Sequence, residues 1–206
     1  RDSTTLIDDH IIRIMEGPDR KLWIETRNGL NIFDPQTEKF DRDPRAYLAQ
    51  LSIPDGVITD IHKDQSGNFW LIHPQQGLIK YNNSTHNTTI IRKRSDLTNG
   101  IISAFSEDSE GNLWIVYQNG TIEKMGGRTN TVIYSNSALK NHNKSSLLNY
   151  NLFIDSDNEL WIHVADDPRG VFYFKPSNNV LLPINKETVR VRLNTNIVTG
   201  VLQGSD

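Results

Sequence analysis

The chain has 206 residues and a formal net charge of −3, with 36% hydrophobic and 23% charged residues. This composition is typical of a globular domain with an apolar core, and it offers no excess of positive charge for nucleic acid or an anionic membrane. Cysteine is absent, which excludes disulfides, zinc–thiolate sites and a cysteine nucleophile. No apolar run approaches the roughly 18 residues of a membrane span, so no membrane segment is predicted within these residues.

The first ten residues, "RDSTTLIDDH", contain no apolar run and no cleavage pattern. We therefore predict no signal peptide here, and we expect the sequence to be a piece of a longer protein.

Tryptophan recurs along the chain with its surroundings. The spacings between successive tryptophans are 47, 44 and 47 residues, and each Trp stands between Leu or Phe and Ile or Leu. A glycine follows each Trp within ten residues. We interpret this as four copies of one structural unit, because a fixed period of this length is the mark of a repeat protein. The repeated residues are Trp23, Trp70, Trp114 and Trp161, with Gly29, Gly77, Gly120 and Gly170.

Each unit contains the same succession of strands and turns. An alternating apolar stretch ("IIRIM", "VITDIH", "IISAFS", "YNLFI") leads into a turn ("GPDRK", "DQSGN", "DSEGN", "DSDNE"), and the Trp-containing strand follows. In the third unit Asp108 and Gly111 suit the turn, and Asn119-Gly120 favours a type I′ hairpin. The expected strands of this unit, named A to D, span residues 101–107, 113–117, 121–125 and 131–134.

We predict an all-β fold, namely a β-propeller with four four-stranded antiparallel blades and the first strand of a fifth, as a fragment of a larger propeller. A β-sandwich, the alternative, would not place a Trp, a glycine and an acidic turn in one register four times. The Trp side chains are expected to fill the space between neighbouring blades. Residues 1–206 would form a single fragment, with blades at 7–41, 53–92, 97–135 and 147–185 and the next blade beginning at 194–206. On this register the next Trp would lie near position 210, so we expect further repeats.

The repeat unit resembles the two-component regulator propeller repeat. The copies closest to that pattern are "ITDIHKDQSGNFWLIHPQQGLIKYN" (58–82) and "LWIETRNGLNIFDPQTEKF" (22–40). The resemblance implies the periplasmic sensor region of a Bacteroides-type hybrid two-component system, with a membrane helix and a histidine kinase outside these residues. It also implies an oligosaccharide signal from a complex glycan, a homodimer, and control of transcription.

One feature departs from that family. The Gly-Thr pair expected after Trp-Ile is replaced each time by larger residues, and this puts any inherited ligand pocket in doubt. The replacing pairs are Glu25-Thr26, Ile72-His73, Val116-Tyr117 and His163-Val164.

Motifs for catalysis are missing from the sequence. No phosphate-binding glycine loop, no G-x-S-x-G elbow and no H-E-x-x-H pattern occurs. "DSDNEL" begins like a calcium loop, but Leu160 stands where glycine is needed and Asp166 where glutamate is needed. The six histidines lack ligand-like spacing. We therefore predict no catalytic residue, no metal and no cofactor, although "D-x-x-G-N-x-W" also matches streptogramin-lyase-like propellers, which would need a catalytic histidine and a metal.

Blade topology indicates where a ligand would bind. In an antiparallel A-B-C-D blade, the B–C turns and the D–A connections (42–54, 92–99, 135–149) emerge on one face. Loops on a rigid scaffold commonly carry binding residues, and sugars suit aromatic, amide and charged groups. The candidate ligand-binding residues on this face are Arg27, Tyr47, His73, Gln75, Gln76, Tyr117, Tyr150, Asp167 and Arg169.

Three functions are compatible with the sequence. The first is an extracytoplasmic oligosaccharide sensor that is not itself an enzyme, with no nucleic-acid partner and with membrane attachment only through other parts of the protein. The second is a propeller enzyme, either a lyase or a glycosidase. The third is a propeller that serves only as a protein–protein interaction module.

Overall fold

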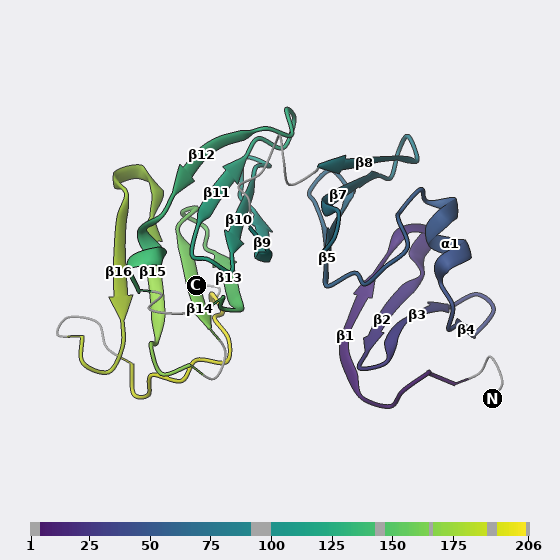
Figure 1. Ribbon diagram of the computed structural model, residues 1–206, viewed down its shortest axis with the longest axis horizontal. Helices are drawn as coiled ribbons and strands as arrows, with labels where there is room; N and C mark the ends of the chain where they lie inside the picture. The colour runs from purple at the N-terminus through teal and green to yellow at the C-terminus, as the bar shows by residue number, and fades with distance from the viewer. Residues whose placement is uncertain (1–4, 92–99, 143–146, 165–166, 189–192, 205–206) are drawn as a thin grey trace. The chain divides into compact units, whose positions relative to one another are not determined.

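The structure is a computed structural model that describes residues 5–91, 100–142, 147–164, 167–188 and 193–204. The chain divides into two compact units, Arg1–Ile91 and Arg92–Asp206, and each is described by itself (Figure 1). Each unit contains two four-stranded antiparallel sheets. Among the described residues, no helix has the length and apolar character needed to cross a membrane.

Unit 1 begins with blade 1, a sheet in the order β1-β2-β3-β4. Its strands are β1 (Ile11–Glu16), β2 (Leu22–Thr26), β3 (Gly29–Asp34) and β4 (Lys39–Asp41), and a short 3-10 helix (Pro18–Arg20) lies in the first turn. The helix α1 (Arg45–Gln50) interrupts the connection to the next blade. Blade 2 repeats the order with β5 (Asp60–Lys63), β6 (Phe69–His73), β7 (Gly77–Asn82) and β8 (Asn87–Ile91).

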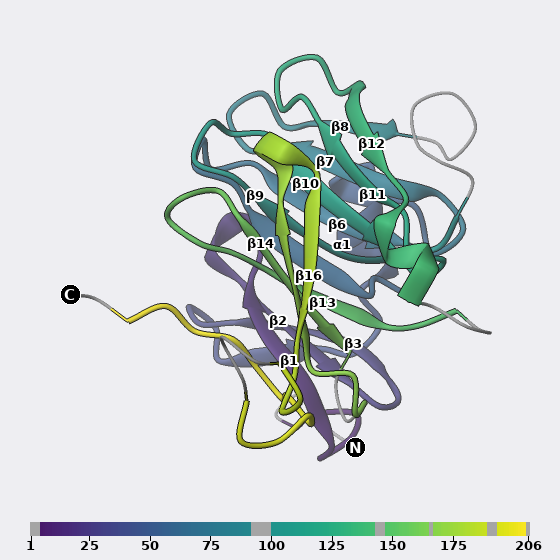
Figure 2. The ribbon, with the colours of Figure 1, turned by 90° about the vertical axis from the view of Figure 1, so that its left-hand side faces the viewer.

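Unit 2 contains blades 3 and 4. Blade 3 consists of β9 (Ile102–Glu107), β10 (Leu113–Tyr117), β11 (Ile122–Met125) and β12 (Val132–Asn136), and a 3-10 helix (Ala138–His142) follows. Blade 4 consists of β13 (Tyr150–Ile154), β14 (Leu160–Val164), β15 (Val171–Lys175) and β16 (Val180–Ile184), with a 3-10 helix (Pro176–Asn178) before β16. Figure 2 views this sheet from its β16 edge. The four strands predicted for the third repeat, which is blade 3, agree with the observed strands to within two residues at each end.

The predicted all-β fold of four four-stranded sheets is confirmed. That residues 1–206 form one propeller fragment stays a prediction. The expected D–A connection at 92–99 and part of the one at 135–149 lie outside the described residues.

The tryptophans are core residues within their units. Trp23, Trp70 and Trp114 are at most 2% exposed. Trp23 belongs to a cluster with Ile61, Leu71 and other residues of blade 2, and Trp114 to a cluster that includes Leu160 of blade 4. Burial of these rings between sheets is the main apolar contribution that a blade makes to its neighbour.

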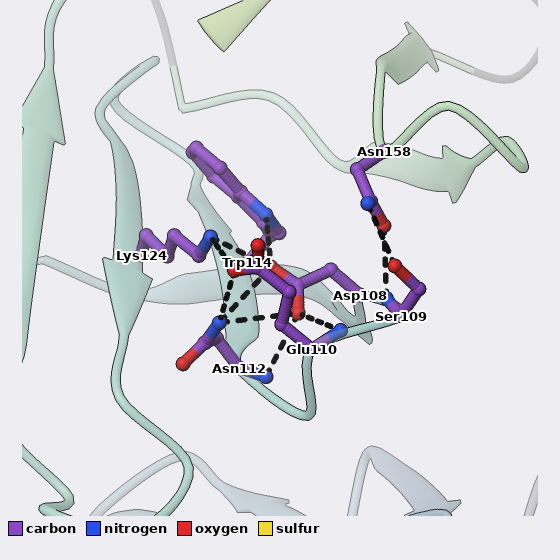
Figure 3. Close-up of polar contacts among 7 residues, drawn as sticks. All are labelled: Asp108, Ser109, Glu110, Asn112, Trp114, Lys124 and Asn158. Atoms are coloured by element: carbon purple, nitrogen blue, oxygen red, sulfur yellow. Dashed lines mark hydrogen bonds and ion pairs between the residues drawn. The ribbon is translucent and has the colours of Figure 1, made fainter. Parts of the chain in front are cut away.

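The acidic turn explains why Asp recurs six residues before Trp. In blade 3 the Asp108 carboxylate accepts hydrogen bonds from the backbone nitrogens of Glu110 (3.0 Å) and Asn112 (2.9 Å) and from Trp114 Nε1 (3.1 Å) (Figure 3). Lys124 Nζ lies 2.9 Å from the same carboxylate and 5.4 Å from the centre of the Trp114 ring. One buried carboxylate thus closes the turn and orients the ring. The same Asp–Trp bond recurs between Asp64 and Trp70 (2.9 Å) and between Asp155 and Trp161 (2.7 Å).

Blade 1 lacks this carboxylate because Gly17 takes its place. A Cβ atom added at Gly17 would lie only 2.1 Å from Trp23 Nε1, so no side chain fits there without a shift. Trp23 Nε1 makes no hydrogen bond of normal geometry among the described residues. It does face the Tyr47 hydroxyl, whose pKa is raised by burial and lowered to a smaller extent by the Trp23 indole.

Neighbouring blades of unit 2 are also joined by polar contacts between their A–B turns. In unit 2, Ser109 and Asn158 exchange two hydrogen bonds (2.8 and 2.7 Å), and Asn158 points toward Ser109 from blade 4 (Figure 3). Ser156 and Gln203 exchange an equivalent pair (2.9 and 2.7 Å). The C-terminal segment therefore contacts the A–B turn of blade 4, where the start of a fifth blade is predicted. No strand is assigned within residues 193–204.

Candidate functional site

A pocket of about 490 Å³ opens in unit 1, among the turn between β2 and β3, the connection that carries α1, and the residues before β5. These are a B–C turn and a D–A connection, so the pocket lies on the face where the topology predicts ligand binding. Its polar lining comes from Glu25, Thr26, Arg27, Asn28, Arg42, Arg45 and Asp55, and its apolar lining includes Ile12, Leu30, Leu48, Val57 and Ile58.

The turn between β2 and β3 presents Arg27 to the pocket. Thr26 Oγ1 donates to the Gly29 carbonyl (2.8 Å), which closes the turn, and the Arg27 nitrogen donates to the His10 carbonyl (3.1 Å). The Arg27 side chain is exposed. No described residue makes a hydrogen bond or ion pair with its guanidinium. Arg27 is thus held by its backbone, while its five donors remain available.

The connection between the blades supplies two more arginines. Arg42 Nε donates to the Thr5 carbonyl at 2.7 Å, and Arg45 makes a two-pronged hydrogen bond with Asp43. Arg45 lowers the pKa of the Asp43 carboxyl through this bond. The adjoining residues Tyr47 and Leu48 are buried in the core. The core therefore anchors α1, whose first residue is Arg45, and Arg42 lines the pocket from three residues before the helix.

His73 holds in place the pocket residues that precede β5. Its Nδ1 accepts hydrogen bonds from the backbone nitrogens of Gln75 (3.2 Å) and Gln76 (3.3 Å), so Nε2 carries the proton and donates to the Asp55 carbonyl (3.1 Å). The ring packs against Gly56, where an added Cβ would lie 2.5 Å from Nε2. Gly56 also has a φ of 144°, which disfavours other residues. His73 therefore clamps the residues before β5 to the β6–β7 turn.

An ionic cluster lies beside the pocket. Arg13 of β1 pairs with Asp60 of β5 and stands opposite Glu25 in the strand register. Burial raises the pKa of Glu25, the Arg13 charge opposes the rise, and Asp60 adds to it. Burial likewise raises the pKa of Asp60, against the opposing effect of Arg13. Glu25 Oε2 is buried and has no hydrogen-bond partner among the described residues.

The candidate residues of unit 1 take different positions. Arg27 lines the pocket, and His73 stands behind its wall. Gln75 and Gln76 lie in the β6–β7 turn, where the Gln75 side chain is exposed. Tyr47 does not reach the surface: it is 7% exposed, its ring meets Trp23 edge-on, and its hydroxyl donates to the Pro18 carbonyl (3.0 Å).

The candidate residues of unit 2 are largely engaged in the fold. Tyr117 is fully buried and donates to Glu123 (2.7 Å), and Tyr150 belongs to the core cluster around Trp114. Asp167 and Arg169 form an ion pair at 2.9 Å in the β14–β15 turn. The three tyrosines among the candidate ligand-binding residues, Tyr47, Tyr117 and Tyr150, are therefore all buried.

Several pocket residues were not among the candidates chosen from the sequence, namely Glu25, Asn28, Arg42 and Arg45. Asn28 and Arg42 stand within the predicted turn and connection, and the run "DRDPRAY" places two arginines there. The number of arginines in this connection is the signal that could have identified Arg42 and Arg45. Among the described residues, no group of three or more His, Asp or Glu side chains lies close enough to hold a metal ion.

Comparison with known proteins agrees with this fold. Residues 96–119 match the family described as "Two component regulator propeller". The chain carries a two component regulator propeller repeat. The repeat covers the A–B turn and strand β10 of blade 3, including the Asp108 to Trp114 bond. No curated protein sequence matches the chain.

Solved structures share the β-propeller fold. The chain is similar to the extracellular domain of a hybrid two component system from B. thetaiotaomicron (19% identity, TM-score 0.64, covering 98% of this chain and 25% of that one). A one component system from the same organism has an extracellular domain with 19% identity and a TM-score of 0.58, covering 84% of this chain and 24% of that one. Virginiamycin B lyase from Staphylococcus aureus has 11% identity and a TM-score of 0.57, covering 85% and 55%. The propeller chain thus spans about a quarter of the length of the two extracellular domains.

Proposed function

We propose that this chain is the ligand-sensing part of the periplasmic region of a hybrid two-component sensor histidine kinase. It binds an oligosaccharide released from a complex glycan, and a kinase elsewhere in the protein passes the signal on to transcription of glycan-use genes. The repeat in blade 3 and the fold shared with extracellular domains of such systems support this role. We also propose that the full protein acts as a homodimer.

One observation carries the proposal. The unit 1 pocket lies among a B–C turn and a D–A connection of blades 1 and 2, and it offers charged and amide groups to a ligand. Concave sites of this size, between apolar walls and a few convergent polar groups, are the usual places for small ligands.

Calorimetry on the 206-residue chain, combined with mass spectrometry of the recovered sugar, tests the proposal. We expect saturable binding of an oligosaccharide from a panel of plant and host glycans, with the sugar recovered unchanged. If no oligosaccharide binds, the sensor function is overturned for this chain, and binding to a protein partner alone would favour an interaction module.

A propeller enzyme is the second candidate, because the lyase from Staphylococcus aureus shares the fold. Cleavage or rearrangement of a bound oligosaccharide in the same experiment would favour the enzyme over the sensor. Loss of that turnover on addition of a chelator would identify a metal-dependent lyase.

A further inference from the structure

The lining of the unit 1 pocket differs from that of a site for a neutral sugar. Sugar rings without charge are commonly held by an aromatic face, which contacts their CH groups, together with a few hydroxyl partners. Among the described residues that line this pocket, none is aromatic. Tyr47, the neighbour of the lining residue Leu48 in α1, is turned into the core against Trp23.

The pocket is lined by charged side chains instead of an aromatic ring. Three guanidinium groups, those of Arg27, Arg42 and Arg45, line the pocket together with the carboxyl groups of Glu25 and Asp55. Arg45 is already engaged by Asp43, and Arg42 is bound to Thr5. Arg27 is the member whose guanidinium has no described partner, and it stands on a rigid two-residue turn. A planar fork of five donors fits a carboxylate or a sulfate through two parallel hydrogen bonds.

We propose that this pocket binds the anionic group of an acidic sugar, a uronate carboxylate or a sulfate ester, through Arg27, with Arg42 and Arg45 adding positive charge at its edge. The inference rests on the proposed sensor function and narrows its ligand to acidic oligosaccharides. The rim of apolar side chains, Ile12, Leu30 and Val57, packs against the ring carbons. Asn28 Nδ2 already donates to the Asp8 carboxylate (2.6 Å), so its second N–H and its Oδ1 are what it offers to hydroxyls beside the anion.

Glu25 allows a second test of the ligand's charge, because its carboxylate would repel an anion. It lines the pocket, and its Oε2 is buried without a hydrogen-bond partner among the described residues. If the pocket takes an acidic sugar, Glu25→Gln removes a repulsion and strengthens binding. If the pocket takes a neutral sugar, Glu25 is a hydroxyl acceptor, and the same substitution weakens binding.

Calorimetry at pH 7 and low salt tests the proposal on the 206-residue chain with matched probes. Tetragalacturonate is compared with its methyl ester, and a carboxyl-reduced chondroitin sulfate tetrasaccharide with its desulfated form, so that the first pair tests carboxylate alone and the second tests sulfate alone. We expect one acidic probe to bind at least about tenfold more tightly than its neutral counterpart, and Arg27→Ala to weaken it about 10- to 100-fold. Arg27→Lys should retain part of the affinity. Raising the salt concentration should weaken binding, because a partly exposed ion pair is screened.

Lys39→Ala is the matched control, since it removes one exposed positive charge of blade 1 outside the pocket lining. It should leave the affinity unchanged, and the melting temperatures of the variants should agree because the exposed Arg27 guanidinium makes no hydrogen bond or ion pair with a described residue. Equal affinity for acidic and neutral probes, or equal effects of Arg27→Ala and Lys39→Ala, would overturn the inference while the sensor function stands. Failure of every acidic and neutral oligosaccharide to bind would overturn both.

Discussion

Two carboxyl groups, Asp108 in unit 2 and Glu25 in unit 1, have opposite surroundings. Asp108 is 1% exposed, accepts from Trp114 and the turn backbone, and pairs with Lys124. Burial tends to raise the pKa of Asp108, but Lys124 and Asn112 outweigh it and hold the pKa below its ordinary value. Burial raises the pKa of Glu25, whose Oε2 has no partner among the described residues. Asp108 stabilises the fold. Glu25 lines a pocket and has a buried oxygen without a partner among the described residues, which is typical of a binding site, where function is kept at some cost in stability.

The largest effect is expected from Asp108→Ala. The substitution leaves Trp114 Nε1 and the turn nitrogens without their acceptor and leaves Lys124 with Glu110 alone (3.2 Å), so the free energy of unfolding should fall by about 3 kcal/mol. Urea denaturation followed by Trp fluorescence measures the change. Asp157→Ala, in the equivalent turn of blade 4 but with an exposed side chain, is the control and should change stability by less than about 0.5 kcal/mol. Equal losses in the two variants would show that the Asp108 contacts contribute nothing.

A smaller loss is expected from His73→Ala, which extends the comparison to the pocket wall. The substitution removes the ring acceptor of the Gln75 nitrogen and the donor to Asp55, while the Gln76 nitrogen keeps the His73 carbonyl (3.1 Å), so we expect a loss of about 2 kcal/mol. Gln75→Ala, which changes only an exposed side chain of the same turn, should stay near wild type. Hydrogen exchange should also show faster exchange at 55–58 in His73→Ala alone, and unchanged exchange there would rule out the clamp.

The pH dependence of stability should have opposite signs at the two carboxyl groups. Because the folded pKa of Asp108 is lowered, its contribution is present above the unfolded pKa, about 3.9, and is lost as pH falls through the folded value. The stability gap between wild type and Asp108→Asn should therefore narrow below about pH 4. Glu25 has a raised folded pKa, so its ionisation lowers stability as pH rises above the unfolded value of about 4.3. A gap for Asp108→Asn that widens in acid would contradict the assignment.

The smallest effect is expected from Glu25→Gln. The amide has no charge to bury, so the free energy of unfolding at pH 7 should stay equal or rise by up to about 1 kcal/mol, reduced by partial solvent screening. At pH 4 the two proteins should unfold alike. Thermal unfolding at both pH values checks this, and a clear loss of stability at pH 7 would show that Glu25 is a stabilising partner of Arg13.

The repeated parts of the fold are predicted best from the sequence, because the same residue pattern occurs in four repeats and each copy supports the others. The Trp spacing, the Asp108 turn and the bounds of β10 could all be read from residue pattern. The orientation of single side chains could not. Tyr117 ends a strand that is buried on both faces, so alternation along the strand does not reveal whether its ring reaches the surface.

The face of the candidate site was predicted from topology, whereas its composition was not. Arg42 and Arg45 have the sequence context of ordinary polar loop residues, and their place in the pocket lining follows from tertiary contacts, namely the buried Leu48 of α1 and the bond from Arg42 to Thr5. Glu25 stands at a position that the resemblance marked as unusual, yet its lack of a partner follows from the packing around β1 and β2.

The most direct test of the account is the affinity ratio between tetragalacturonate and its methyl ester, measured by calorimetry in the wild-type chain and in Arg27→Ala. The chondroitin pair takes their place if sulfate is the preferred anion. The account predicts a ratio of at least about ten in the wild type that falls toward one in the variant. A ratio that is the same in both proteins would contradict it.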